Sequence, residues 1–117
     1  MDKYLHLCLD STGSVADAAQ ILEQNKPKIC LVVDGNKLLG TITDGDIRRG
    51  LLKGIPFDVP ATRVMNAKPR TATQGSDRKS LQSLMSTQGL LYIPTVDDAG
   101  QLTGLITFDD LVRGSQS

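Results

Sequence analysis

The stretch Leu39-Gly-Thr-Ile-Thr-Asp-Gly-Asp-Ile-Arg-Arg-Gly50 returns later in the chain as an altered copy, Leu102-Thr-Gly-Leu-Ile-Thr-Phe-Asp-Asp-Leu-Val-Arg-Gly114. Six positions are identical at an offset of 64 residues: Gly40, Ile42, Thr43, Asp46, Arg49 and Gly50 match Gly104, Ile106, Thr107, Asp110, Arg113 and Gly114. Upstream the offset drops to 63, because the second copy carries one extra residue in its hairpin, where Val33-Asp34 matches Val96-Asp97. The chain therefore consists of one unit built twice.

Each copy is predicted to follow the order β-α-β-β-α. In the first copy we expect a strand through Leu5, Leu7 and Leu9, a helix over about 15–25 capped by Ser14, strands over 29–33 and 38–43, and a short helix over 46–52. In the second copy we expect an extended segment over 70–73, a helix over 78–88, strands over 92–96 and 102–107, and a helix over 109–113.

The predicted domain organisation has a first unit over residues 1–55, a linker over 56–63 and a second unit over 64–117. Pro56 and Pro60 mark the linker. A three-stranded sheet with one covered face is small for an independent domain, so we expect the two units to pack together as one fold of the α/β (α+β) class.

Composition excludes several classes of protein. Thirteen acidic residues balance thirteen basic ones and only 3% of residues are aromatic, which argues against a nucleic-acid-binding protein. No apolar run approaches the roughly 20 residues that cross a bilayer. The chain lacks a secretory signal, and two cysteines are too few for a disulfide framework, so we expect a cytoplasmic protein.

The residue content also argues against catalysis and a metal site. His6 is the single histidine, which excludes a histidine-based metal cluster. The chain has no Gly-Lys-Ser/Thr phosphate loop and offers no plausible pair of nucleophile and base. Asp44, Asp46, Asp109 and Asp110 are the only candidates for paired acids or Mg²⁺ ligands. We therefore expect a protein that is not an enzyme.

The repeated turn carries groups suited to a ribose phosphate. Gly40 permits close approach, Thr43 stands where a strand ends, and a helix opens near Asp46. A threonine hydroxyl can donate to a phosphate oxygen, a helix N-terminus favours an anion, and a carboxylate can accept from two sugar hydroxyls. Gly104, Thr107 and Asp110 repeat the set. The same Thr-x-x-Asp spacing is also that of a helix capping box, and both roles can coexist.

The doubled unit, with Gly-x-x-Thr-x-x-Asp ending each copy and Val-Asp before each hairpin, resembles a tandem cystathionine-β-synthase (CBS) domain pair, or Bateman module. The resemblance covers about residues 10–114. It implies two β-α-β-β-α units packed about a pseudo-twofold axis, two clefts that bind adenosine nucleotides, and further pairing into a homodimer. Thr43 and Asp46 would then serve phosphate and ribose in one cleft, and Thr107 and Asp110 in the other.

The resemblance also implies further site residues. Contacts to the base would come from backbone and apolar groups around the hairpin strands: Lys28, Ile29, Cys30, Tyr92, Ile93 and Pro94. From the residues alone, Cys30 is expected to be a buried small hydrophobe. Arg48 and Arg49 could supplement the phosphate site, although adjacent arginines are more often a solvated helix face.

A narrower likeness concerns the segment from Leu38 to Gly54 followed by Val64-Met65-Asn66. It resembles CBS pairs that precede a sugar-phosphate nucleotidyltransferase domain in bacteria. That likeness implies a regulatory fragment that senses AMP, ADP, ATP or a related ligand such as S-adenosylmethionine and controls an attached catalytic domain. The alternative is a dimerisation scaffold that works without a ligand. The sequence does not select the nucleotide.

Overall fold

The computed structural model describes residues 4–114, which divide into two compact units on either side of the Pro69–Arg70 bond. The two units have a mixed α and β architecture, as predicted, with two sheets and four α-helices among the described residues. None of the helices within this range has both the length and the apolar character that crossing a membrane requires.

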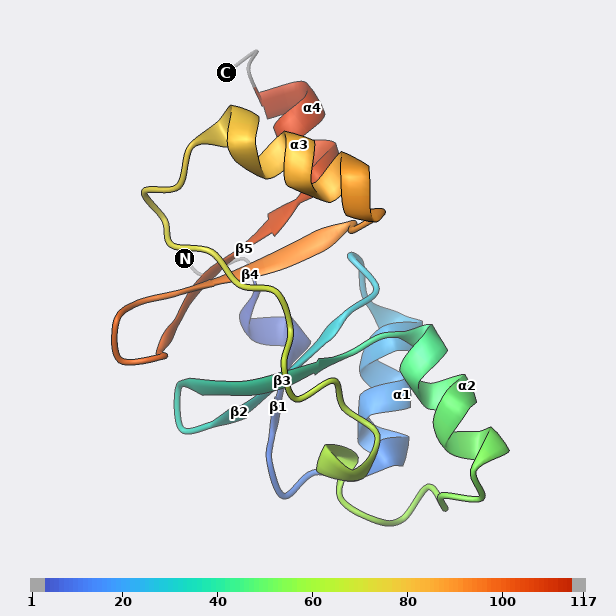
Figure 1. Ribbon diagram of the computed structural model, residues 1–117. Helices are drawn as coiled ribbons and strands as arrows, with labels where there is room; N and C mark the ends of the chain where they lie inside the picture. Colours follow the sequence, from blue (N-terminus) through green and yellow to red (C-terminus); the bar gives the residue numbers. More distant parts are fainter. Residues whose placement is uncertain (1–3, 115–117) are drawn as a thin grey trace. The chain divides into compact units, whose positions relative to one another are not determined.

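The first unit has the predicted β-α-β-β-α order. Its elements are β1 (Cys8–Asp10), α1 (Val15–Gln24), β2 (Cys30–Asp34), β3 (Lys37–Ile42) and α2 (Asp44–Leu52). The strands form one sheet in the order β1-β2-β3, in which β1 runs parallel and β3 antiparallel to β2. Helices α1 and α2 lie next to each other beside this sheet (Figure 1).

The start of the chain differs from the prediction. Leu5–Leu7 form a 3-10 helix, and the strand begins only at Cys8. Leu7 is fully buried while Leu5 is 53% exposed, so the alternating leucines do not share one face of a strand. The expected strand through Leu5 and Leu7 was wrong.

The core of the first unit lies between α1 and the sheet. Ser14 and Asp17 form the capping box that starts α1, with Asp17 N donating to Ser14 Oγ at 3.1 Å and Ser14 N donating to Asp17 Oδ2 at 3.0 Å. This start directs the apolar stripe of the helix onto the strands. The resulting cluster contains Ala18, Leu22, Cys30, Val32, Ile42 and Ala61.

The segment after α2 packs against the first unit. Val15 N and Ala16 N, two donors of the first turn of α1, bond to Val59 O and Phe57 O at 2.9 Å each. Further on, Asn66 and Thr41 exchange two backbone hydrogen bonds of 3.1 and 2.8 Å, which hold the segment along β3. The predicted linker thus satisfies unpaired groups at a helix start, and Asn66, three residues beyond it, does the same at a strand edge.

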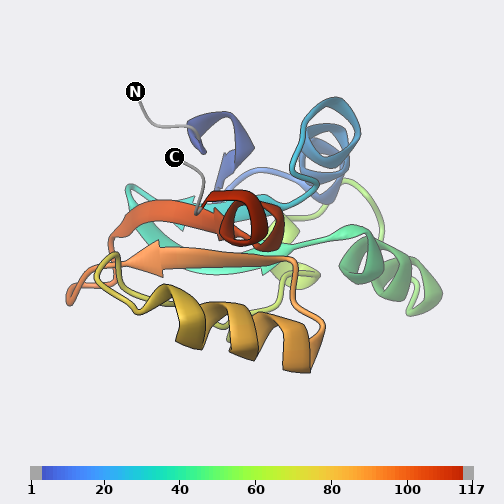
Figure 2. The same ribbon diagram turned by 90° about the horizontal axis from the view of Figure 1, so that it is seen from above.

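The second unit consists of α3 (Arg78–Gln88), β4 (Tyr92–Val96), β5 (Leu102–Thr107) and α4 (Phe108–Gly114). Strands β4 and β5 form an antiparallel hairpin, over which α3 and α4 lie side by side (Figures 1 and 2). Asp77 caps α3 by accepting from Ser80 N at 2.9 Å. The core cluster of this unit contains Leu81, Met85, Ile93 and Leu111.

The duplication persists in the backbone pairing. Leu9 pairs with Val32 in the first unit, and Ala72 makes an isolated parallel bridge with Thr95 in the second, at the same offset of 63 residues. The first strand of the unit is thus reduced to a single bridge in the second copy. Both hairpins also have a register shift at equivalent places, between Val32 and Val33 and between Thr95 and Val96.

Gly40 is required by the close approach of the segment that follows α2. A Cβ at this position of β3 would lie 2.5 Å from Asn66 O and 2.7 Å from Met65 Sδ. The backbone oxygen cannot move without loss of the bonds between Thr41 and Asn66.

Gly40→Ala should therefore lower the free energy of unfolding by about 1–3 kcal/mol, the usual cost of overpacking. Gly75→Ala is the matched control, because Gly75 lies outside the left-handed region and a Cβ there would meet nothing within 4 Å. Urea unfolding of both variants and the parent measures the difference. Equal stabilities of the two variants would contradict the close approach.

Candidate functional site

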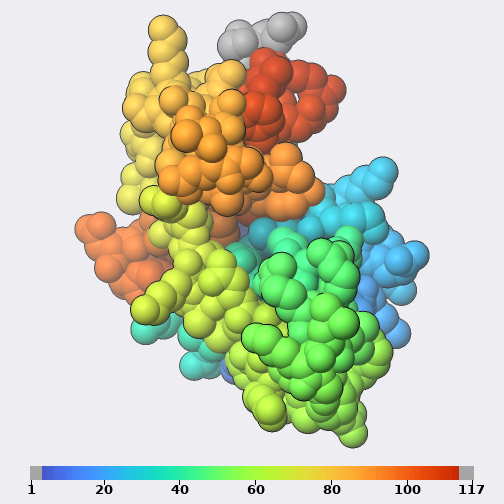
Figure 3. All heavy atoms as spheres, turned by 45° about the vertical axis from the view of Figure 1, so that its right-hand side comes forward, coloured from blue at the N-terminus to red at the C-terminus, as the bar shows by residue number. Residues whose placement is uncertain are grey.

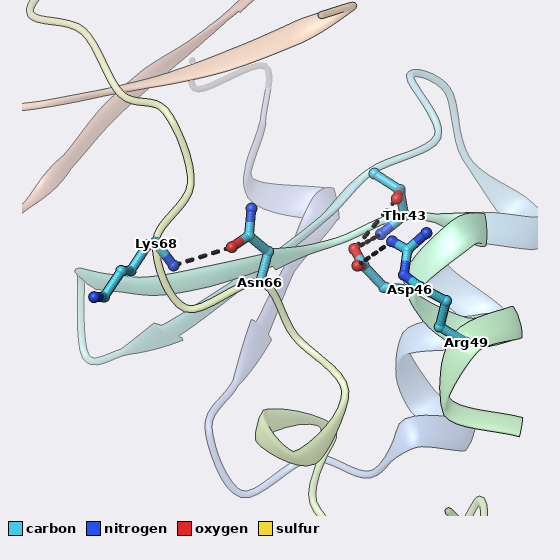
Figure 4. A network of polar contacts seen from close by, with 5 residues as sticks. All are labelled: Thr43, Asp46, Arg49, Asn66 and Lys68. Carbon is cyan, nitrogen blue, oxygen red and sulfur yellow. Dashed lines mark hydrogen bonds and ion pairs between the residues drawn. The ribbon is translucent and has the colours of Figure 1, made fainter. Parts of the chain in front are cut away.

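The turn between β3 and α2 brings together the predicted phosphate and ribose residues of the first unit. Thr43 follows the last residue of β3 and is the N-cap of α2. Asp46 Oδ2 accepts from Thr43 N at 2.9 Å and from the Thr43 hydroxyl at 3.2 Å (Figure 4). The carboxylate therefore stabilises the helix start, as the capping-box interpretation predicted, and the hydroxyl stands beside it.

Arg49 completes this network. Its Nη2 donates to Asp46 Oδ1 at 2.8 Å, so the guanidinium and the carboxylate form an ion pair (Figure 4). The Asp46 side chain is only 14% exposed, whereas the Arg49 side chain is 60% exposed. The cation is thus the more accessible partner, because most of its side chain lies in water.

The second unit arranges the equivalent residues differently. Thr107 ends β5, and its Oγ1 accepts from Asp110 N at 3.0 Å. Asp110 is exposed, and within residues 4–114 its carboxylate has no hydrogen bond or ion pair. Arg113, the equivalent of Arg49, forms an ion pair with Asp109 instead. The two copies of the motif therefore hold their aspartates in different electrostatic surroundings.

A pocket of about 390 Å³ adjoins the motif of the second unit, and it is lined by Leu91, Tyr92, Thr107, Phe108, Asp109 and Val112. Phe108 N donates to Leu91 O at 2.8 Å, which holds the start of α4 against the segment before β4. The lining is mostly apolar and aromatic, with one hydroxyl and one carboxylate. Ligand pockets in proteins commonly have this composition and a volume of about 300–1,000 Å³.

The two glycines of the motif lie where the backbone is crowded. Gly40 faces the Met65–Asn66 segment, and a Cβ at Gly104 would lie 2.9 Å from Thr95 Oγ1. Gly40 pairs with Val32 across the first hairpin, and Gly104 pairs with the equivalent residue, Thr95, across the second. The close approach expected at these positions is therefore made by the chain itself.

Four of the six residues expected to contact a base are buried, whereas Lys28 is exposed and Tyr92 is partly buried. Ile29, Cys30, Ile93 and Pro94 are all nearly inaccessible, and Cys30 and Ile93 belong to the core clusters of their units. Burial raises the pKa of the Cys30 thiol to about 12, with a smaller contribution from Cys8, so the thiol stays neutral. Any contact of these residues with a ligand would come from the backbone.

Of the remaining predicted residues, Arg48 is exposed on α2 and has no hydrogen bond or ion pair to the described part of the chain. Asp44, Asp46, Asp109 and Asp110 do not gather into a metal site. Among residues 4–114, no group of three or more His, Cys, Asp or Glu side chains is placed to hold a metal ion.

Sequence reasoning missed the partners of the two arginines. Gly45 and Asp109 are equivalent positions, and the i,i+4 spacing of Asp109 and Arg113 was the available signal for their ion pair. It also missed the contact made by Arg78, whose Nη2 donates to Leu111 O at 2.9 Å and so ties α3 to α4.

The chain belongs to the CBS domain family, whose sequence pattern it matches over residues 4–53 and 61–117. It is 31% identical over 103 residues to arabinose 5-phosphate isomerase GutQ of Escherichia coli O6:H1, a match that covers 87% of the chain and 32% of that protein. It is 31% identical over 108 residues to inosine-5'-monophosphate dehydrogenase of Nitrosopumilus maritimus, covering 92% of the chain and 22% of that protein. The chain thus spans about a third or less of the length of these curated relatives.

Solved structures show the same fold. The CBS domain pair of protein MJ0100, in complex with 5'-methylthioadenosine and S-adenosyl-L-methionine, has a TM-score of 0.78 and 26% identity, over 95% of this chain and 90% of that one. CBSX2 in complex with AMP has a TM-score of 0.79 and 23% identity, over 93% and 86% of the two chains. At that identity the second comparison shows the fold alone.

Because Asp46 and Asp110 have different surroundings, we expect their replacement by alanine to affect stability differently. Asp46→Ala should lower the free energy of unfolding by roughly 1 kcal/mol, because it removes the carboxylate that caps α2. Asp110→Ala should leave stability close to that of the parent, because the hydrogen bond to Thr107 uses the backbone N–H. Urea unfolding measures both, and a similar loss for the two variants would contradict the geometry.

Proposed function

We propose that the chain is a regulatory module that senses an adenosine nucleotide through Thr43 and Asp46 in the first unit and Thr107 and Asp110 in the second. One observation carries the proposal: in both units a threonine follows the last apolar residue of a strand, and an aspartate stands three residues later. A hydroxyl can donate to a phosphate oxygen, and a carboxylate can accept from the two ribose hydroxyls. The role is regulatory and not catalytic.

Each unit adds a second feature that suits a nucleotide. In the first unit, the start of α2 presents unpaired N–H groups and a partial positive charge beside Thr43, which favours phosphate. In the second unit, the pocket beside Thr107 offers Tyr92 and Phe108 to a planar base. The first unit thus supplies partners for phosphate and ribose, and the second unit supplies partners for ribose and base.

The family supports the same ligand class. The MJ0100 domain pair, 26% identical to this chain, was solved with two ligands that are both adenosine derivatives. We propose AMP, ADP, ATP or a related adenosine compound as the ligand of this chain. The free cysteines Cys8 and Cys30 suit the reducing cytoplasm, which we propose as its compartment.

Regulation requires that the ligand binds one conformation more tightly than another, since equal affinity for both shifts nothing. We propose that the ligand controls a catalytic domain that acts on sugar phosphates or nucleotides. The sequence offers a narrower candidate for this catalytic domain, a sugar-phosphate nucleotidyltransferase. Neither of the two curated relatives described above is a nucleotidyltransferase. Those relatives carry the matching segment in a sugar-phosphate isomerase and a nucleotide dehydrogenase.

The parent should bind AMP saturably in isothermal titration calorimetry. Asp46→Ala and Asp110→Ala should each abolish one site or weaken it by about 10- to 100-fold, because each removes charge-assisted hydrogen bonds to the ribose. Asp98→Ala is the charge-matched control, since Asp98 is exposed in the second hairpin. Unchanged AMP binding by both single variants and by the double variant would overturn the site.

The surface of α2 supports a second proposal, a homodimer. Leu51, Leu52 and Phe57 are 51%, 81% and 44% exposed, and they lie at the end of α2 and in the segment that follows it. Helix α2 is uncovered on the face of the molecule shown in Figure 3. Large apolar side chains exposed on neighbouring stretches of the chain are candidates for an interaction site. A dimer that forms without any nucleotide response would favour the scaffold function.

Leu52→Glu should convert the dimer to a monomer in sedimentation velocity, because it places a charge in the apolar cluster. Leu5→Glu is the control. Leu5 is also an exposed leucine, at 53%, but it lies before β1 and therefore outside the α2 region of the sequence. Both variants should keep the circular dichroism spectrum of the parent. A parent that sediments as a monomer at tens of micromolar would contradict the dimer.

A further inference from the structure

The Asp46 carboxylate is nearly saturated with hydrogen bonds. Its Oδ2 accepts from Thr43 N at 2.9 Å and from Thr43 Oγ1 at 3.2 Å, and its Oδ1 accepts from Arg49 Nη2 at 2.8 Å. A carboxylate offers about four acceptor positions. One position therefore remains, whereas two ribose hydroxyls need two.

The Asp110 carboxylate is in the opposite state. Within the described part of the chain it accepts no hydrogen bond, and Thr107 contacts only its backbone N–H. Arg113 is held by Asp109, one residue earlier. As far as residues 4–114 are concerned, both oxygens of Asp110 are thus open to a diol.

The residue before each aspartate explains the difference. Position 45 is glycine, so Arg49 has no carboxylate four residues before it and pairs with Asp46 three residues before it. A Cβ at position 45 would lie 3.1 Å from Arg49 Nη1 and 3.4 Å from Nη2, so the guanidinium lies close to the backbone of Gly45. In the second unit Asp109 occupies this position and takes the arginine.

We propose that Arg49 makes the first unit selective for phosphorylated nucleosides, while the second unit also accepts uncharged ones. This inference rests on the proposed function. An uncharged nucleoside leaves the Thr43 hydroxyl on Asp46, so its diol can occupy the carboxylate only when Arg49 leaves, and it gives the arginine no new partner. A phosphate bound at Thr43 gives Arg49 a new partner close by. The threonine hydroxyl lies 3.2 Å from the Asp46 carboxylate, which holds the guanidinium in this structure.

Arg49 is free to make this exchange. Its side chain is 60% exposed, and its ion pair is of the surface type that contributes little to stability. The phosphate receives a charge-assisted hydrogen bond when the arginine moves, so the cost of breaking the pair is offset only for an anionic ligand. Arg49 is thus a specificity-determining residue that acts through Asp46.

The test measures AMP and adenosine binding by calorimetry in the Asp110→Ala background, where only the first unit contributes. Arg49→Met should strengthen adenosine binding about two- to fivefold, because it frees Asp46. It should weaken AMP binding about tenfold or more, because it removes a contact to phosphate. The preference for AMP over adenosine should therefore fall at least tenfold. Arg113→Met in the Asp46→Ala background is the matched control and should leave the preference of the second unit unchanged.

Gly45→Asp provides an independent test that keeps Arg49 in place. It supplies a carboxylate four residues before the arginine, as in the second unit, so adenosine should bind about two- to fivefold more tightly. The neighbours of the new Cβ are the ends of a flexible side chain, so the helix should tolerate the change.

The outcomes separate the two proposals. If AMP binding depends on Asp46 but neither Arg49→Met nor Gly45→Asp changes the preference for AMP, the selectivity proposal is wrong and the proposed function stands. If the parent binds neither AMP nor adenosine, the proposed function fails and the selectivity proposal fails with it.

Discussion

In each unit, one hydrogen-bonded turn joins a strand to a helix with no loop between them. Ile42 is the last residue of β3, Thr43 caps the helix, and Asp44 is the first residue of α2. Because a helix start exposes several unpaired N–H groups, a junction this short needs side chains that satisfy them locally. The bond from Thr43 N to Asp46 Oδ2 meets part of this need, and with the hydroxyl bond it sets the direction in which α2 leaves the sheet. Ile47 then reaches the core, so packing of the first unit and presentation of its polar groups share one cause.

Much of the fold could be predicted from local chemistry. The bounds of α3, β4 and β5 are those expected, since a capping aspartate, an apolar helical stripe and a β-branched run all agree there. The prediction failed where a pattern was ambiguous. Leu5, Leu7 and Leu9 alternate with polar or small residues as in a strand. Leu5–Leu7 nevertheless form a 3-10 turn, which buries Leu7 and leaves Leu5 exposed. In the second unit, Thr71 and Thr73 flank Ala72 without large apolar side chains, and the strand there shrinks to one bridge.

The candidate site shows a sharper limit. The repeat identified both Thr–Asp pairs. Conserving these residues in both copies does not, however, guarantee that their side chains have the same partners. Arg49 and Arg113 are equivalent, and the residue before each aspartate, Gly45 or Asp109, decides which carboxylate each one meets. A strand pattern likewise indicates that Ile29, Cys30, Ile93 and Pro94 are buried. It does not tell whether a ligand would reach their main chain, because backbone accessibility depends on neighbouring segments.

The register shifts in the two hairpins separate the turns at their tips from the Thr–Asp motifs at the other end. The second hairpin has one more residue than the first, yet Val32 faces Gly40 just as Thr95 faces Gly104. The extra residue is therefore absorbed beyond the register shift, and a Cβ added at Gly35, at the first tip, would meet nothing within 4 Å. The tips are natural points of attachment: a fluorophore or an affinity handle inserted between Gly35 and Asn36 would extend into solvent and leave the pairing intact. A module of this size could in that way be turned into an optical reporter for its own ligand.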